Sequence, residues 1–180
     1  LNLKDAVLWP RYLHFMTASL AVGGLFIAVV WTLKKQQGIA EADANIQLGM
    51  RWFTGATLAQ LLVGFWFQMS LPREIIHLFL GDSALHTAVF AFAMLLFIQT
   101  VYHGVRSRVW PAAASVSVLI AVMILMRDLV RTAYLKPYFH IRDLTVIQES
   151  GPMILFFVSL ILVSGAILWV LRLLPAVEEK

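Results

Sequence analysis

Five histidines are the residues of this sequence best suited to chemistry, because an imidazole nitrogen can hold a metal, move a proton or form a hydrogen bond. His14, His86 and His103 fall within long apolar stretches, whereas His77 and His140 fall in the connections between such stretches. An ionisable side chain inside a membrane-spanning stretch is costly and usually functional. The three histidines within apolar stretches are therefore the leading candidates for a binding site.

His14 and His86 are predicted to lie at the same depth in a membrane. His14 follows Arg11 by three residues, and His86 follows Asp82 by four. The first and third apolar stretches run in the same direction, because two reversals of the chain separate them. Two imidazoles at one level on two helices are what bis-histidine haem ligation needs. The alternative is that each histidine only forms a hydrogen bond across a pair of helices.

His103 lies at the opposite end of the same predicted helix as His86. A second haem at that end would need another axial ligand, for which Met50 is a candidate. Interfacial hydrogen bonding is the other interpretation of His103. His77 and His140 could serve a haem propionate, a quinone carbonyl or only the structure.

The polar segment MRDLVRTAYLKPYFHIRD holds further candidates. If the fourth predicted helix continues into this segment, Arg127 and Arg131 lie one turn apart on one face. A quinone site needs hydrogen-bond donors, an acid or base and an apolar slot. Within this segment, the donors and the acid or base could come from Asp128, Arg131, Tyr134 and His140. Alternatively, the arginines pair with haem propionates or reach lipid phosphates as an end cap.

These candidates must be positioned by helices that cross a membrane. Of the 180 residues, 61% are hydrophobic and 13% are charged, whereas a soluble domain carries about 25% charged residues. Five apolar stretches have the length of a membrane-spanning helix, and none shows the alternation of a membrane strand. The sequence therefore predicts an all-α integral membrane bundle of five transmembrane helices in one domain, 1–180. The predicted helices cover residues 12–33, 53–71, 84–105, 109–126 and 153–171.

The absence of cysteine limits the cofactors that the chain can hold. It excludes disulfides, iron–sulfur ligation by this chain and the covalent attachment of a c-type haem. Any haem must therefore be bound noncovalently, as haem b. The net charge of +4 comes without a basic run interleaved with aromatic residues, so no nucleic-acid partner is expected.

The basic residues divide evenly between the two predicted membrane faces, so the positive-inside rule does not decide the orientation. The short motifs LKK and VRSR favour a cytoplasmic position for the first and third loops, which puts the N-terminus in the periplasm. The first ten residues show no cleavable signal peptide. The first apolar stretch is therefore expected to act as its own insertion signal.

The stretch LHFMTASLAVGGLF resembles the first helix of a superfamily of small membrane cytochromes. The superfamily includes copper-resistance-D type membrane proteins and the membrane part of certain urate oxidases. Their first helix often carries a histidine, a small residue three or four positions later, and Gly-Gly beyond. His14, Ala18, Gly23 and Gly24 match that order, although residues 21–22 stand where a tryptophan is usual. The resemblance covers one helix and implies a b-type haem protein in an electron-transfer chain.

The leading hypothesis is a haem b-binding subunit of a respiratory oxidoreductase complex in a bacterial inner membrane, rather than a stand-alone enzyme. It would pass electrons between the quinone pool and a c-type cytochrome or iron–sulfur subunit, with lipid around it. One haem is expected, with His14 and His86 as iron ligands, or two if His103 ligates another. The predicted cofactor-binding residues are His14, His86, His103, Arg131, Tyr134 and His140. The alternatives are a haem-free anchor or assembly subunit and a small transporter.

Overall fold

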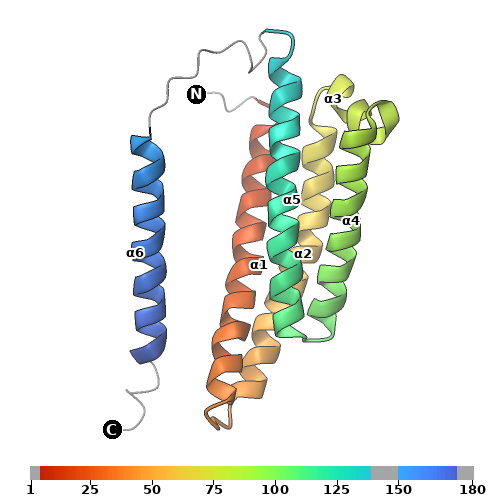
Figure 1. The fold of residues 1–180 in the computed structure, drawn as a ribbon. Coiled ribbons are helices and arrows are strands. Elements are labelled where there is room, and N and C mark those ends of the chain that lie inside the picture. Colours follow the sequence, from red (N-terminus) through yellow and green to blue (C-terminus); the bar gives the residue numbers. More distant parts are fainter. Residues whose placement is uncertain (1–4, 139–149, 174–180) are drawn as a thin grey trace. The chain divides into compact units, whose positions relative to one another are not determined.

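The computed structural model describes residues 5–138 and 150–173, and all regular structure in these ranges is helical (Figure 1). The all-α prediction is therefore confirmed. The chain forms two compact units, Leu1–Tyr138 and Phe139–Lys180. The assignment of the whole chain, 1–180, to one domain stays a prediction.

The helix boundaries agree best with the sequence at the third predicted span. It forms α4, whose ends coincide with the predicted 84–105. The second predicted span lies in a helix that begins well before residue 53, and the fourth continues past residue 126. In the first unit the elements are α1 (Leu8–Lys35), α2 (Ala42–Met69), α3 (Arg73–His77), the π-helix η1 (Leu78–Asp82), α4 (Ala84–Val105) and α5 (Val109–Leu135). The second unit contains α6 (Gly151–Leu173).

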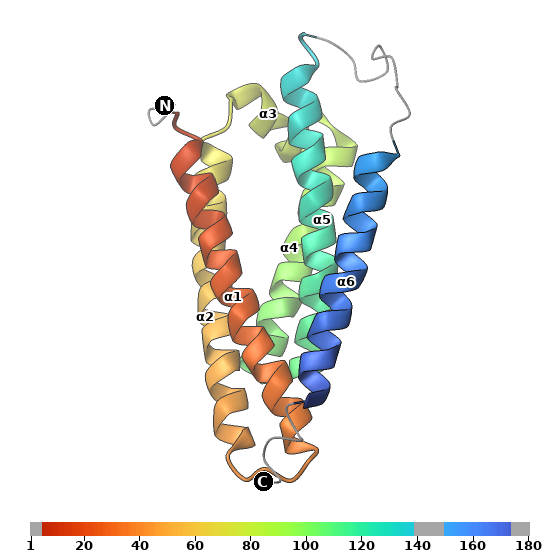
Figure 2. The same ribbon diagram turned by 90° about the vertical axis from the view of Figure 1, so that its left-hand side faces the viewer.

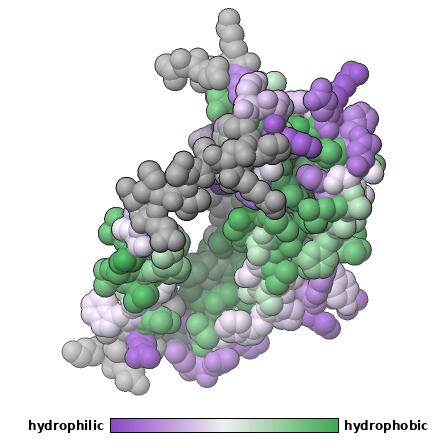
Figure 3. Space-filling view, turned by 45° about the horizontal axis from the view of Figure 1, so that its top comes forward, coloured by the Kyte–Doolittle hydropathy of each residue, from purple (hydrophilic) through white to green (hydrophobic). Residues whose placement is uncertain are grey.

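The prediction of five membrane-spanning helices is wrong by one. In the described parts of the chain, four helices are long and apolar enough to cross a membrane, namely α1, α4, α5 and α6. The predicted span 53–71 falls largely in α2, where Gln60 and Gln68 interrupt the apolar run. Thr54 and Thr57 are also in that run, and each donates a hydrogen bond to a carbonyl four residues earlier. The four apolar helices mark the chain as a membrane protein, and Figure 3 shows hydrophobic side chains between hydrophilic ends.

Helices α1 and α2 run antiparallel and touch through their backbones. A Cβ atom added to Gly24 would lie 2.6 Å from the backbone nitrogen of Phe53, and one added to Gly49 would lie 2.6 Å from the carbonyl oxygen of Gly24. Glycine at both positions therefore permits the close approach. Ala28, which is fully buried, continues the same contact one turn further along α1.

Three hydrophobic clusters hold the first unit together. The first joins α1, α2 and α5, and its buried members are Ala21, Leu25, Ala28, Ile46, Met50, Phe53, Val109 and Ala112. The second is built on the buried residues Leu71, Ile75 and Phe79, and it adds side chains of α4 and α5. The third joins α4 to α5 through Ala93, Leu96 and Leu119. Of these clusters, α1 contributes only to the first, through residues 21–31. Figure 2 accordingly shows α1 and α2 diverging from α4 and α5 toward the end where α1 begins.

Candidate functional site

Four of the six predicted site residues lie at one end of the first unit. His14 is near the beginning of α1, His86 is near the beginning of α4, and Arg131 and Tyr134 are near the end of α5. Figure 1 shows that all three helix ends lie at the same end of the unit, at the top. His103 lies near the end of α4 and thus at the opposite end of the unit. His140 lies outside the described residues.

The His14 ring lies against one face of α2. Its Nε2 atom is 3.2 Å from the amide nitrogen of Gln60. The ring stacks on Phe67 with 6.4 Å between the ring centroids. A Cβ atom at Gly64 would be 3.4 Å from Cε1 and 3.6 Å from Nδ1 of His14. Because Gln60, Gly64 and Phe67 recur at helical spacing, α2 presents all three toward the same side.

The second ring nitrogen of His14 has no partner. Nδ1 is buried and makes no hydrogen bond with any described residue. With the Gln60 amide nitrogen facing the ring, the amide donates a hydrogen bond to Nε2 of His14, and the ring proton is then on Nδ1. If the amide group is turned over, Nε2–H donates to the amide oxygen and Nδ1 carries the lone pair. Either way a buried polar atom stays unpaired, which costs about 1–3 kcal/mol. Such an atom is where a proton acceptor or an iron could bind.

His86 is held by the turn that precedes α4. Its Nδ1 atom is 2.7 Å from the hydroxyl oxygen of Ser83, and its ring meets Phe79 edge-on at 5.2 Å between centroids. Gly81 has a φ of +142°, which a residue with a side chain rarely adopts, and it turns the chain from η1 into α4. Nε2 of His86 makes no hydrogen bond to the described residues. A ligating histidine usually forms a hydrogen bond through its other nitrogen, and the Ser83 contact has this form.

His14 and His86 do not contact each other in the described part of the chain. The described residues also contain no group of three or more His, Cys, Asp or Glu side chains that could hold a metal ion. The pairing of His14 and His86 on one haem therefore stays a prediction. None of residues 11–20 of α1 is fully buried, and none belongs to the hydrophobic clusters described above. The α1 side chains at the level of His14 thus take no part in the closed core of the unit.

His103 has the same type of unpartnered nitrogen as His14. Its Nδ1 atom is buried without a hydrogen bond to the described residues, and its ring meets Tyr102 edge-on. The next residue, Gly104, lies so close to α2 that an added Cβ would be 2.5 Å from the Thr54 hydroxyl. Met50, the candidate second ligand, belongs to the first cluster and is 1% exposed. A second haem at His103 stays a prediction.

Arg131 and Tyr134 are on the exposed side of α5. The helix continues through this segment, as the interpretation of the arginines required. The opposite side of α5 packs through Leu129, Val130 and Ala133. No hydrogen bond or ion pair connects Arg131 to another residue of the described ranges.

The sequence analysis missed the residues that hold the two histidines. Gln60 and Gly64 lie against the ring of His14, and Ser83 is the hydrogen-bond partner of His86. A signal was present in each case. Gln60 and Gly64 are four residues apart in an apolar run, and Ser83 is three residues before His86. Which helix His14 would face was not visible in the sequence, because it depends on the crossing of α1 and α2.

Comparison with protein-family models, with curated proteins and with solved structures finds no match to this chain.

Proposed function

We propose that this chain is a haem b-binding subunit of a respiratory oxidoreductase complex. The observation that carries the proposal is the imidazole of His14, which is held by Gln60 through one nitrogen while the other is buried without a partner. An unpaired polar nitrogen in an apolar helix pair is unfavourable unless a ligand completes it. Its location at the same end of the unit as His86 supports a shared ligand.

His14 and His86 are the residues that would hold the haem iron. Ser83 and Gln60 would orient the two rings through the nitrogens that do not ligate. Bound haem would supply one-electron transfer. A second haem at His103 is the extension of this proposal, and it rests on the unpartnered Nδ1 of that ring.

The proposed partners are a quinone and a c-type cytochrome or iron–sulfur subunit. Arg131 and Tyr134 are exposed at the end of the unit that holds His14 and His86, where a quinone headgroup or haem propionates could meet them. The membrane is proposed to be a bacterial inner membrane. LKK lies at the end of α1 and VRSR between α4 and α5, so this end is proposed to be cytoplasmic and the N-terminus periplasmic.

An absorption spectrum of the full chain, expressed with haem and its partners, tests the proposal. We expect b-type bands after reduction with dithionite and extraction of the haem by acidic acetone. His14→Ala and His86→Ala should each abolish the low-spin signal, and the double variant should add little because the two ligands act as one unit. His77→Ala is the matched control, since His77 is exposed at the end of α3. A folded but colourless wild type would instead favour a haem-free anchor or assembly subunit.

The number of haems follows from the same spectra. If His103 ligates a second haem, His103→Ala should remove about half of the haem while the His14-dependent signal stays. If His103 only forms interfacial hydrogen bonds, the haem content should stay at the wild-type value.

A further inference from the structure

A pocket of about 410 Å³ lies at the end of the first unit opposite His14. It is bordered by the end of α1, the beginning of α2, the turn between α4 and α5, and the beginning of α5. The side chains most relevant to a ligand are Lys35, Asp43, Gln47, Ser107, Arg108 and Trp110. We propose that this pocket binds the phosphate of an anionic phospholipid headgroup.

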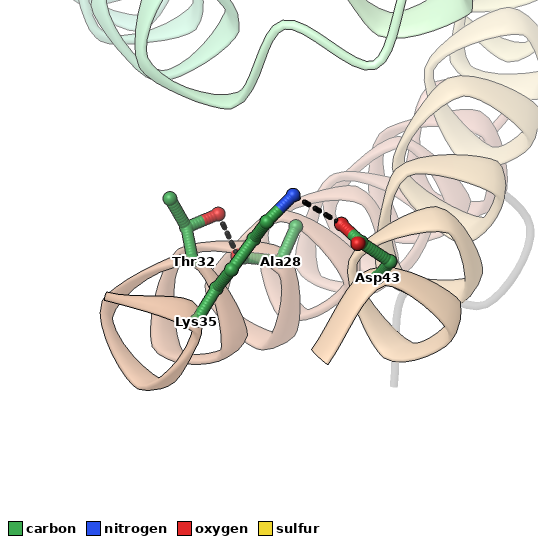
Figure 4. Close-up of polar contacts among 4 residues, drawn as sticks. All are labelled: Ala28, Thr32, Lys35 and Asp43. Atoms are coloured by element: carbon green, nitrogen blue, oxygen red, sulfur yellow. Dashed lines mark hydrogen bonds and ion pairs between the residues drawn. The ribbon is translucent and has the colours of Figure 1, made fainter. Parts of the chain in front are cut away.

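The charges around the pocket leave one cation in excess. Lys35 reaches from α1 to Asp43 on α2, with 2.6 Å between its Nζ atom and the carboxylate (Figure 4). Thr32, also in Figure 4, donates its hydroxyl proton to the carbonyl of Ala28 and is satisfied within α1. Arg108 has no hydrogen bond or ion pair with its side chain in the described part of the protein. Its planar guanidinium can bind a phosphate through two parallel hydrogen bonds.

The beginning of α5 adds backbone donors to the same wall. Arg108 precedes the helix and provides no side-chain cap. The amide groups of Val109 and Trp110 have no acceptor within the helix, because the first backbone bond runs from Ala112 to the carbonyl of Arg108. Helix dipole and free amide groups both favour an anion at this position. They support the binding that the Arg108 charge brings about.

The position of the pocket selects a lipid over a soluble phosphate. The apolar helix α1 ends here and the apolar helix α5 begins here, so the pocket lies at the level of the lipid headgroups. Trp110 is 52% exposed beside it, as is usual for tryptophan at a membrane interface. Buried Ile46 and Val109 give the pocket an apolar floor. A phosphodiester with acyl chains attached satisfies both the charged rim and this floor.

Binding of short-chain phosphatidylglycerol to the purified full chain, measured by native mass spectrometry in a neutral detergent, tests the proposal. Arg108→Gln should weaken binding about fivefold, the effect of one basic residue on an anionic lipid. Arg106→Gln is the matched control, because Arg106 stacks over Tyr102 at 5.5 Å and does not line the pocket. The wild type should prefer phosphatidylglycerol to phosphatidylcholine by a similar factor, and Arg106→Gln should keep that preference.

Asp43→Asn tests independently whether removing a negative charge from the pocket strengthens the binding of the anionic lipid. It removes a carboxylate from the rim and releases Lys35, so phosphatidylglycerol should bind about fivefold more tightly. Equal losses in Arg108→Gln and Arg106→Gln, or weaker binding in Asp43→Asn, would overturn the proposal. Displacement of the lipid by millimolar inorganic phosphate would also overturn it, because the pocket would then take a soluble anion. Asp43, Arg106 and Arg108 are all exposed, so circular dichroism should show wild-type helix content in every variant.

Discussion

Gly23 and Gly24 are adjacent in α1, but the structure predicts opposite consequences when each is replaced by alanine. A Cβ atom on Gly24 would lie 2.6 Å from the Phe53 nitrogen, 2.8 Å from the Gly49 oxygen and 2.9 Å from Trp52 Cβ. A Cβ atom on Gly23 would meet nothing within 4 Å. The two substitutions add the same methyl group to the same helix, so helix propensity cancels in their comparison.

The expected difference follows from these distances. Two of the three atoms that the Gly24→Ala methyl group would meet are backbone atoms, so the clash is relieved only if α1 moves away from α2. Overpacking of this type costs about 1–3 kcal/mol. Gly23→Ala replaces the poorest ordinary helix former at an open position, so it should stabilise the protein by up to about 1 kcal/mol. Because the gain in helix propensity is common to both variants, they should differ by the overpacking cost alone, roughly 1–3 kcal/mol in the free energy of unfolding.

Unfolding of each variant in mixed micelles, followed by circular dichroism as the denaturing detergent is increased, measures this difference. Gly49→Ala should reproduce the loss seen for Gly24→Ala, because its Cβ would lie 2.6 Å from the Gly24 oxygen and 2.7 Å from the Ala28 nitrogen. Equal stabilities for Gly23→Ala and Gly24→Ala would refute the close crossing of α1 and α2.

Three further predictions concern the contacts of α1 with α2. Gln60→Leu should destabilise the protein by about 0.6 kcal/mol, and by no more than about 1.7 kcal/mol, in the same unfolding assay, because these are the average and the largest values for a hydrogen bond between membrane helices. An unchanged stability would mean that His14 and Gln60 do not interact. Gly64→Ala should change the free energy of unfolding by no more than about 0.5 kcal/mol, since its methyl group would meet His14 at an ordinary 3.4 Å. The haem content of the same variant should fall, because the methyl group occupies the space beside Nδ1 of His14. Lys35→Gln should cost less than about 1 kcal/mol in low salt and nothing measurable in high salt, since its ion pair with Asp43 is exposed; a loss that persists in high salt would contradict this.

The sequence predicted helices well where clear local signals end them. The predicted and observed ends of α4 coincide, because Gly81 and Ser83 turn the chain before it and Ser107 adopts a φ of 51° after it. The predicted beginning of the second helix, residue 53, was wrong, because the polar first turns of α2 extend the helix back to Ala42. A window placed on apolar residues cannot detect such turns. The predicted number of spans was wrong because the span 53–71 contains Gln60 and Gln68, which make α2 less apolar than the other long helices.

The sequence could predict at which end of the helices the site residues lie, but not what surrounds them. The direction of α1 and α4 follows from counting reversals, so placing His14 and His86 at one end needed no tertiary information. The ring environment of His14 depends on which face of α1 meets α2, and that face is set by the crossing at Gly24 and Gly49. The Gly-Gly pair is visible as a motif in the sequence, but only the structure shows that Gly24 is packed against α2 and Gly23 is open.

The proposed haem ligands and the proposed lipid pocket are physically independent. His14 and Lys35 are separated by most of the length of α1, roughly 30 Å at 1.5 Å per residue, and the α1–α2 crossing at Gly24 lies between them. Substitutions at sites this far apart, with no shared partner, usually have additive effects. A chain that binds phosphatidylglycerol without haem would thus remain consistent with the pocket, and a chain that binds haem after Arg108→Gln would remain consistent with the histidines. Because α1 is one continuous helix, only a change at the crossing, such as Gly24→Ala, is expected to disturb both ends together.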